Sequence, residues 1–210
     1  MQGHVSILSV SPEAAAMIAS GGRISTMDGT ADEIYANSLS AGQEKNEKLI
    51  GKVLSSGHTS VLEHCYVNLS FENVSVLAEQ FLIEFRLASF TVKSRRYVDF
   101  SKAGYVSPVF TANVQMAIFE RTVESLFGTY DVLEAAGVPK EDARFVLPYC
   151  FCSNFFCSMN ARELVHVMNE LAYGRGSRIP ELRALGESLF AQCEQQIPFL
   201  AVRKPEAYRQ

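Results

Sequence analysis

The sequence has no long apolar run and no excess of positive charge. Its 210 residues include 19 Lys and Arg against 23 Asp and Glu, which gives a net charge of −4. Binding to nucleic acid by counterion release requires a basic face, so we expect no nucleic-acid partner. The longest apolar run is only a few residues long, so we expect no transmembrane helix and no membrane partner.

Other common signals are also missing. The N-terminus lacks a basic segment followed by an apolar one, so no secretory signal is expected. Five cysteines without such a signal are typical of a reduced, cytoplasmic protein. The Walker loop, Gly-x-Gly-x-x-Gly and Gly-x-Ser-x-Gly motifs do not occur, so the nucleotide-binding and hydrolase classes that they mark have no support.

Hydrophobic periodicity predicts a mostly helical α+β fold in a single domain over residues 1–210. Alternation of Val67, Leu69 and Phe71 with polar residues indicates a half-buried strand. Apolar residues at helical spacing predict helices near 49–54, 75–85, 112–136, 139–146 and 160–171, and a last helix from Pro180. The Gly- and Ser-rich stretch 20–30 is interpreted as a loop.

Residues 86–97 concentrate polar groups in an otherwise apolar region, with four cations and three serine or threonine hydroxyls in twelve residues. The planar donor fork of arginine suits phosphate, and hydroxyls add further donors. One interpretation is an anion pocket for a phosphorylated small molecule. The alternative is a solvated basic turn, because charge runs are usually at the surface.

Two clusters contain possible metal ligands. His58, Glu63 and His64 have a spacing that matches no metal motif, so structural histidines are favoured. The second cluster consists of Cys150, Cys152 and Cys157, which are interleaved with phenylalanines. Free cysteine often packs as a small apolar residue, so we predict that this segment belongs to the core and that there is no metal site.

A third cluster begins a predicted helix. Asn160 is a good N-cap residue. Arg162 and His166 are four residues apart and therefore share a helix face, where they could meet either an anion or solvent.

Together these segments resemble the flavin-dependent thymidylate synthases. Residues 57–64, Gly-His-Thr-Ser-Val-Leu-Glu-His, are similar to the family's H-x-S-x-x-E-H segment. Residues 86–97 are similar to the second half of the signature R-H-R-x7-S-x-R-Y, and the resemblance resumes at 137–148 and 160–164. The order and spacing of these segments extend over most of the chain.

The resemblance implies helices packed around an antiparallel sheet, and a homotetramer whose subunits share active sites. It implies reductive methylation at C5 of dUMP or a related pyrimidine nucleotide, without a cysteine nucleophile. Methylenetetrahydrofolate would give the carbon, FAD would carry the hydride and NADPH would reduce the flavin.

The resemblance also assigns residues by position. It implies a catalytic set of Ser94, Arg96 and Tyr97. It implies a nucleotide-binding set, chiefly around the phosphate, of Gln80, Ser94, Arg96 and Arg144. It implies a flavin-binding set of His58, Ser60, Glu63, Arg86, Asn160, Arg162 and His166, with no metal ligand.

The sequence departs from the family pattern at several positions. Glu84 and Phe85 occupy the first two positions of the R-H-R triplet, and Thr91 replaces an asparagine. The family's arginine that holds the pyrimidine base falls near Leu171. Arginine to glutamate changes the local charge by two units, and one unit pair at 4 Å is worth about 4 kcal/mol at a dielectric constant near 20. These departures favour an alternative, either a non-catalytic relative that binds a nucleotide or flavin, or a structural partner subunit of a true synthase.

Overall fold

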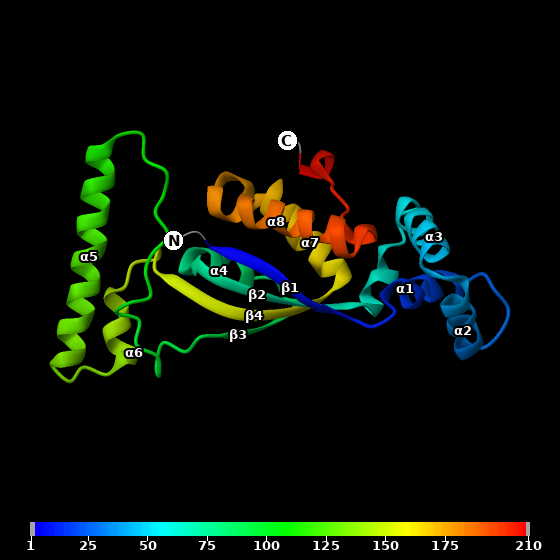
Figure 1. The fold of residues 1–210 in the computed structure, drawn as a ribbon, viewed down its shortest axis with the longest axis horizontal. Helices are drawn as coiled ribbons and strands as arrows, with labels where there is room; N and C mark the ends of the chain where they lie inside the picture. Colours follow the sequence, from blue (N-terminus) through cyan, green and yellow to red (C-terminus); the bar gives the residue numbers. More distant parts are fainter. Residues whose placement is uncertain (1–2, 209–210) are drawn as a thin grey trace. The chain divides into compact units, whose positions relative to one another are not determined.

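The computed structural model describes residues 3–208 and confirms the α+β class. A four-stranded antiparallel sheet has the order β1-β2-β4-β3 (Figure 1). Its strands are β1 (His4–Val10), β2 (Tyr66–Ser75), β3 (Ala88–Val92) and β4 (Cys152–Asn160). Of the described residues, 3–4, 71–84 and 91–156 form one compact unit, called unit 1, and 5–70, 85–90 and 157–208 form unit 2.

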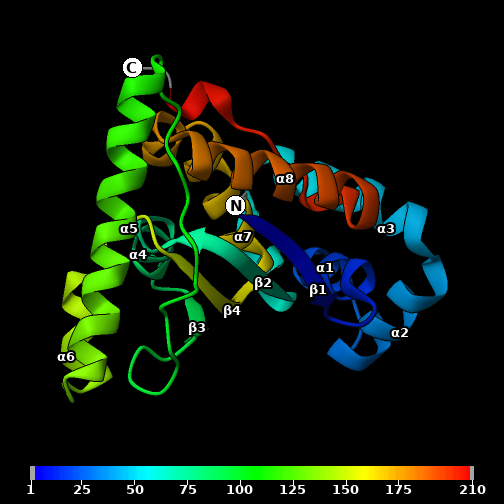
Figure 2. The same ribbon diagram turned by 60° about the vertical axis from the view of Figure 1, so that its left-hand side comes forward.

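The helices of unit 2 confirm most of the predicted boundaries. They are α1 (Ala14–Arg23), α2 (Ala31–Ala41), α3 (Gln43–Ser55), the 3-10 helix η1 (Thr59–His64), α7 (Ala161–Ala172) and α8 (Pro180–Gln196). Helix α3 ends just before Gly57, whose φ of 85° suits a helix terminus, and Pro180 opens α8. Helices α7 and α8 pack side by side (Figure 2).

The prediction of a loop over 20–30 is wrong for its first four residues, which belong to α1. Close packing explains the glycines there. A Cβ atom at Gly21 would lie 3.2 Å from the His64 ring, and one at Gly22 would lie 3.1 Å from Val53. The two glycines therefore let α1 approach η1 and α3, so they serve helix packing and do not mark a break. The segment that contains Glu63 and His64 is also helical, because it forms the 3-10 helix η1.

The helices of unit 1 are α4 (Val76–Ile83), α5 (Asn113–Ala135), α6 (Lys140–Ala143) and the 3-10 turn η2 (Arg144–Val146). Figure 2 shows α6 beside α5. The apolar residues of α5 are only partly buried, since Val123 and Tyr130 are covered whereas Val114 is 65% and Ile118 is 53% exposed. The predicted helix over 139–146 is shorter than expected, because its second half tightens into the 3-10 turn.

Strand β4 carries the cysteine-rich segment and confirms the core interpretation for Cys152 and Cys157, which are buried. Its Phe155 ring stacks on Phe71 of β2 with centroids 4.7 Å apart. Residues 3–208 contain no cluster of three side chains that could bind a metal. No helix in that range is long and apolar enough to cross a membrane.

Candidate functional site

The first candidate region is the turn that follows β3 in unit 1. The backbone N–H of Val98 donates to the carbonyl of Ser94 at 3.1 Å, and the N–H of Arg96 donates to the Ser94 hydroxyl at 3.2 Å. These two bonds close the turn over Arg95, Arg96 and Tyr97. Arg96 and Tyr97 are exposed, Tyr97 to 83%, whereas Arg95 points inward.

Arg95 anchors this turn through a buried ion pair. Its Nη2 atom lies 2.5 Å from Oε2 of Glu79 on α4, and the Glu79 side chain is only 2% exposed. The Ser153 hydroxyl donates to the same carboxylate oxygen, and the Arg95 guanidinium lies 5.2 Å from the centre of the Phe151 ring. Oε2 of this buried carboxylate thus has two donors, and the turn is tied to both α4 and β4.

The exposed cation of the turn already binds a carboxylate. Arg96 Nε lies 3.5 Å from Oε2 of Glu141 on α6. Arg144 follows three residues later, on the next turn of the chain, and its guanidinium lies 5.8 Å from the centre of the Phe145 ring. Residues three apart on helical turns are neighbours, so Arg144 lies next to Glu141, the carboxylate that pairs with Arg96.

Gln80 is half-buried in unit 1, where its Nε2 donates to Oε1 of Glu79 at 3.3 Å. It therefore adjoins the carboxylate that holds Arg95. All of the nucleotide-binding residues that the sequence predicts, Gln80, Ser94, Arg96 and Arg144, belong to unit 1.

The second candidate region is the start of α7 in unit 2. Asn160 caps this helix as predicted, because its Oδ1 accepts the backbone N–H of Glu163 at 2.9 Å. Arg162 Nη1 lies 2.5 Å from Oε1 of Glu63 on η1. One turn later, the His166 ring meets the Phe85 ring edge-on with centroids 5.5 Å apart.

A cavity of about 480 Å³ lies on this face of α7, entirely within unit 2. Its apolar wall includes Leu54, Leu62, Leu87, Val165 and Val202. Its polar wall includes Thr59, Arg162, His166, Asn169, Lys204 and Tyr208. The volume and the mixture of an apolar floor with a few polar groups are typical of a small-molecule site.

The structure brings only part of the predicted flavin-binding set to this cavity. All seven residues lie in unit 2, and Arg162 and His166 line the cavity together, which confirms that they share a face. His58, Ser60 and Arg86 are exposed outside its wall. Glu63 reaches it only through Arg162, and the side-chain oxygen of Asn160 is engaged by the helix end.

The cavity also contains residues that the sequence did not indicate. Lys204 and Tyr208 come from the C-terminal segment. They lie more than thirty residues after His166, the last predicted site residue on α7. Thr59 lines the cavity in place of its predicted neighbours. No local motif marks Lys204 and Tyr208, whereas Thr59 occupies the variable position between His58 and Ser60 in the H-x-S-x-x-E-H segment.

Two departures from the family pattern are core residues here. Leu171 is fully buried, and Phe85 is 6% exposed against His166. Neither position offers a polar group to a ligand. The positive charge of the cavity wall comes instead from Arg162 and Lys204.

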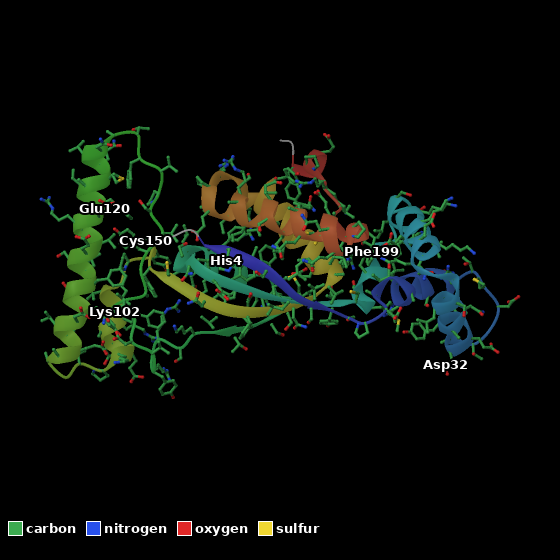
Figure 3. The ribbon with its side chains drawn as sticks, in the orientation of Figure 1. His4, Asp32, Lys102, Glu120, Cys150 and Phe199 are labelled. Carbon is green, nitrogen blue, oxygen red and sulfur yellow. The ribbon has the colours of Figure 1, made fainter. Side chains whose placement is uncertain are left out.

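The cysteines are poorly suited to nucleophilic attack. Four are buried, and Cys150 is half-buried in the segment that leads into β4 (Figure 3). Burial raises the pKa of Cys157 to about 12 and that of Cys193 to about 12, and it also raises the pKa of Cys65 and Cys150. At neutral pH these thiols are therefore protonated, and the thiolate is the nucleophilic form.

Comparison with known proteins identifies the family. Residues 6–199 match the family model of the thymidylate synthase complementing proteins. The chain is 31% identical over 209 residues to the flavin-dependent thymidylate synthase of Nitratidesulfovibrio vulgaris, covering 94% of this chain and 84% of that protein. It is 34% identical over 166 residues to the protein of the same name from Geobacter sulfurreducens, covering 77% and 70%. The chain therefore belongs to the flavin-dependent thymidylate synthase family.

A solved structure shows the same fold. The crystal structure of the UMP/dUMP methylase PolB from Streptomyces cacaoi, bound with 5-Br dUMP, matches with a TM-score of 0.78. The match covers 95% of this chain and 93% of that chain at 20% sequence identity.

The residues of the unit 2 cavity fit part of a flavin dinucleotide. Leu62, Leu87 and Val165 provide apolar surface for a heteroaromatic ring, while Arg162 and His166 can donate to phosphate oxygens. Phe85, at the second position of the triplet, cannot form the hydrogen bonds of the ring that the family has there. Arg162 and His166 remain as donors.

Proposed function

We propose that the protein is a flavin-dependent methyltransferase that converts dUMP, or a related uridine nucleotide, to its C5-methyl form. The observation that carries the proposal is the exposed guanidinium of Arg96. It lies on a turn that is closed by hydrogen bonds to Ser94, and it already binds the carboxylate of Glu141. The same planar fork binds phosphate. Ser94 and Arg144 add a hydroxyl and a second cation for the 5′-phosphate.

Further roles follow from the family. Gln80 is proposed to contact the nucleotide, and Tyr97 to act with Ser94 and Arg96 at the reacting base. Bound FAD would supply the hydride, methylenetetrahydrofolate the carbon and NADPH the reducing equivalents. The protonated, buried thiols support a route in which no cysteine adds to the uracil ring.

We also propose a homotetramer. The support is the apolar surface that α5 leaves exposed, since Val132 is 67% exposed in addition to Val114 and Ile118. Large apolar side chains gathered on one helix are typical of a surface that a partner covers. Size-exclusion chromatography with light scattering tests this directly.

The first test of the activity is the visible absorbance of the purified protein after desalting with and without added FAD. A stoichiometric flavin spectrum supports the proposal, and release of tritium from [5-³H]dUMP with methylenetetrahydrofolate and NADPH then establishes the methylation. A colourless protein that rejects FAD while still binding dUMP would favour the alternative, a non-catalytic relative. A protein that binds neither ligand would favour a structural subunit.

The second test concerns the phosphate site. Arg96→Ala should weaken dUMP binding by about 1.5–3 kcal/mol, the scale of a hydrogen bond to a charged group. Arg183→Ala on the exposed surface of α8, outside both candidate regions, is the matched control. A dUMP titration that Arg96→Ala leaves unchanged would remove Arg96 from the phosphate site. Parallel titrations with UMP decide between the two sugars.

A further inference from the structure

The C-terminal segment after α8 is fixed to unit 2 by a strong set of contacts at Arg203. The Arg203 Nη1 atom donates to Oε2 of Glu187 at 2.7 Å and to the Tyr173 hydroxyl at 2.8 Å, and Nη2 lies 3.2 Å from Oε1 of Glu194. The guanidinium also lies 4.2 Å from the centre of the Phe190 ring. These contacts to the end of α7 and to α8 hold the segment in one place.

Asn169 of α7 fixes the residues on either side of Arg203. Its Nδ2 donates to the carbonyl of Val202 at 2.8 Å, and its Oδ1 accepts the backbone N–H of Lys204 at 2.6 Å. Asn169 is itself only 2% exposed. The side chain of Arg203 is thus directed to α8, while its neighbours Val202 and Lys204 line the unit 2 cavity.

The result is a row of polar groups along one face of α7, with a cation, Arg162 or Lys204, at each end. Arg162, His166 and Asn169 follow at intervals of four and three residues, and Lys204 is bound to the last of them. Seven residues of helix rise about 10 Å, so the row spans about that length. No salt bridge of Lys204 occurs among the described residues, whereas Arg162 is paired with Glu63.

We propose that Lys204, held at the cavity wall by Asn169 and Arg203, is a binding residue for the phosphate groups of the dinucleotide cofactor. This inference rests on the proposed function and extends its cofactor site to the C-terminal segment. A single ammonium group acts on phosphate as a point charge, and its contribution depends on ionic strength. Lys204 therefore favours a flavin that carries phosphates over one that carries none.

The test is a titration of the flavin-free protein with FAD and with riboflavin, which lacks phosphate. Lys204→Gln should weaken FAD binding about tenfold and leave riboflavin binding unchanged. Lys204→Arg should keep most of the affinity for FAD. Lys45→Gln, on the exposed surface of α3 away from the cavity, is the matched control. Raising the salt concentration should weaken FAD binding more in the wild type than in Lys204→Gln.

The outcomes separate this inference from the proposed function. If the wild type binds FAD and Lys204→Gln binds it equally well, Lys204 is not a phosphate ligand, but the proposed cofactor stands. If Lys204→Gln weakens FAD and riboflavin by the same factor, the residue acts on the shape of the cavity, and the inference is also overturned. If the wild type binds neither compound, the proposed flavin chemistry itself fails.

Discussion

Replacing Arg95 by methionine should destabilise the protein far more than replacing Arg162 by methionine, although both arginines approach a carboxylate at 2.5 Å. The Arg95 and Glu79 side chains are 19% and 2% exposed, whereas those of Arg162 and Glu63 are 51% and 43% exposed. Loss of one partner of a buried pair leaves an uncompensated charge and costs about 3–5 kcal/mol. Loss of an exposed pair costs about 1 kcal/mol or less.

The measurement is urea denaturation followed by far-UV circular dichroism at pH 7, without nucleotide or flavin. Methionine preserves apolar contact with the Phe151 ring, so the comparison isolates the charge. The double variant Arg95→Met/Glu79→Gln removes both charges and should recover at least about 1 kcal/mol of the loss, because residues in direct contact are not additive.

Two results would refute this reasoning. Equal destabilisation by Arg95→Met and Arg162→Met would show that burial does not set the strength of these pairs. A double variant at Arg95 and Glu79 that loses the sum of the two single losses would show that the side chains do not interact.

Three further predictions concern other groups. Glu141→Gln should strengthen dUMP binding, because it frees Arg96 from a competing carboxylate, and a weaker titration would contradict this. Asn160→Ala should lower the free energy of unfolding by about 1 kcal/mol through loss of the helix cap, as measured by urea denaturation. Burial raises the pKa of Cys157 and Cys193 to about 12, so above pH 8.5 the unfolded chain loses thiol protons that the folded chain keeps. Stability should therefore fall as the pH rises from 8.5 towards 12, and less steeply after substitution of both cysteines by alanine.

Three helix boundaries were predictable because local residues set them, whereas helices α1 and α2 were not predicted. Asn160 caps α7, Pro180 opens α8 and Gly57 follows α3, and each effect acts within a few residues of the chain. Strand β4 was not predicted, because most of its side chains are buried and the pattern shows no clean alternation. Strand β3 has only five residues, in which half-buried apolar side chains alternate with exposed Ser89 and Thr91, and so short an alternation was not singled out as a strand.

The residues of the candidate site were likewise predictable only where a local motif marks them. Sequence motifs indicated the Ser94 to Tyr97 segment but not that Arg95 is its buried anchor, because Glu79 lies sixteen residues away on another element. They indicated Arg162 and His166 on one face of a helix. They could not indicate Lys204, since its place in the cavity depends on how a distant segment docks on α7.

The close packing around Leu171 limits which side chains position 171 can hold. A Cβ atom at Gly186 of α8 would lie 2.8 Å from the Cβ of Leu171, and one at Gly176 would lie 3.0 Å from its Cα. An arginine at position 171 would have to place its charge in this closed contact. Leu171→Arg should therefore destabilise the protein, whereas an exposed position nearby, such as that of Arg175, holds an arginine without this cost.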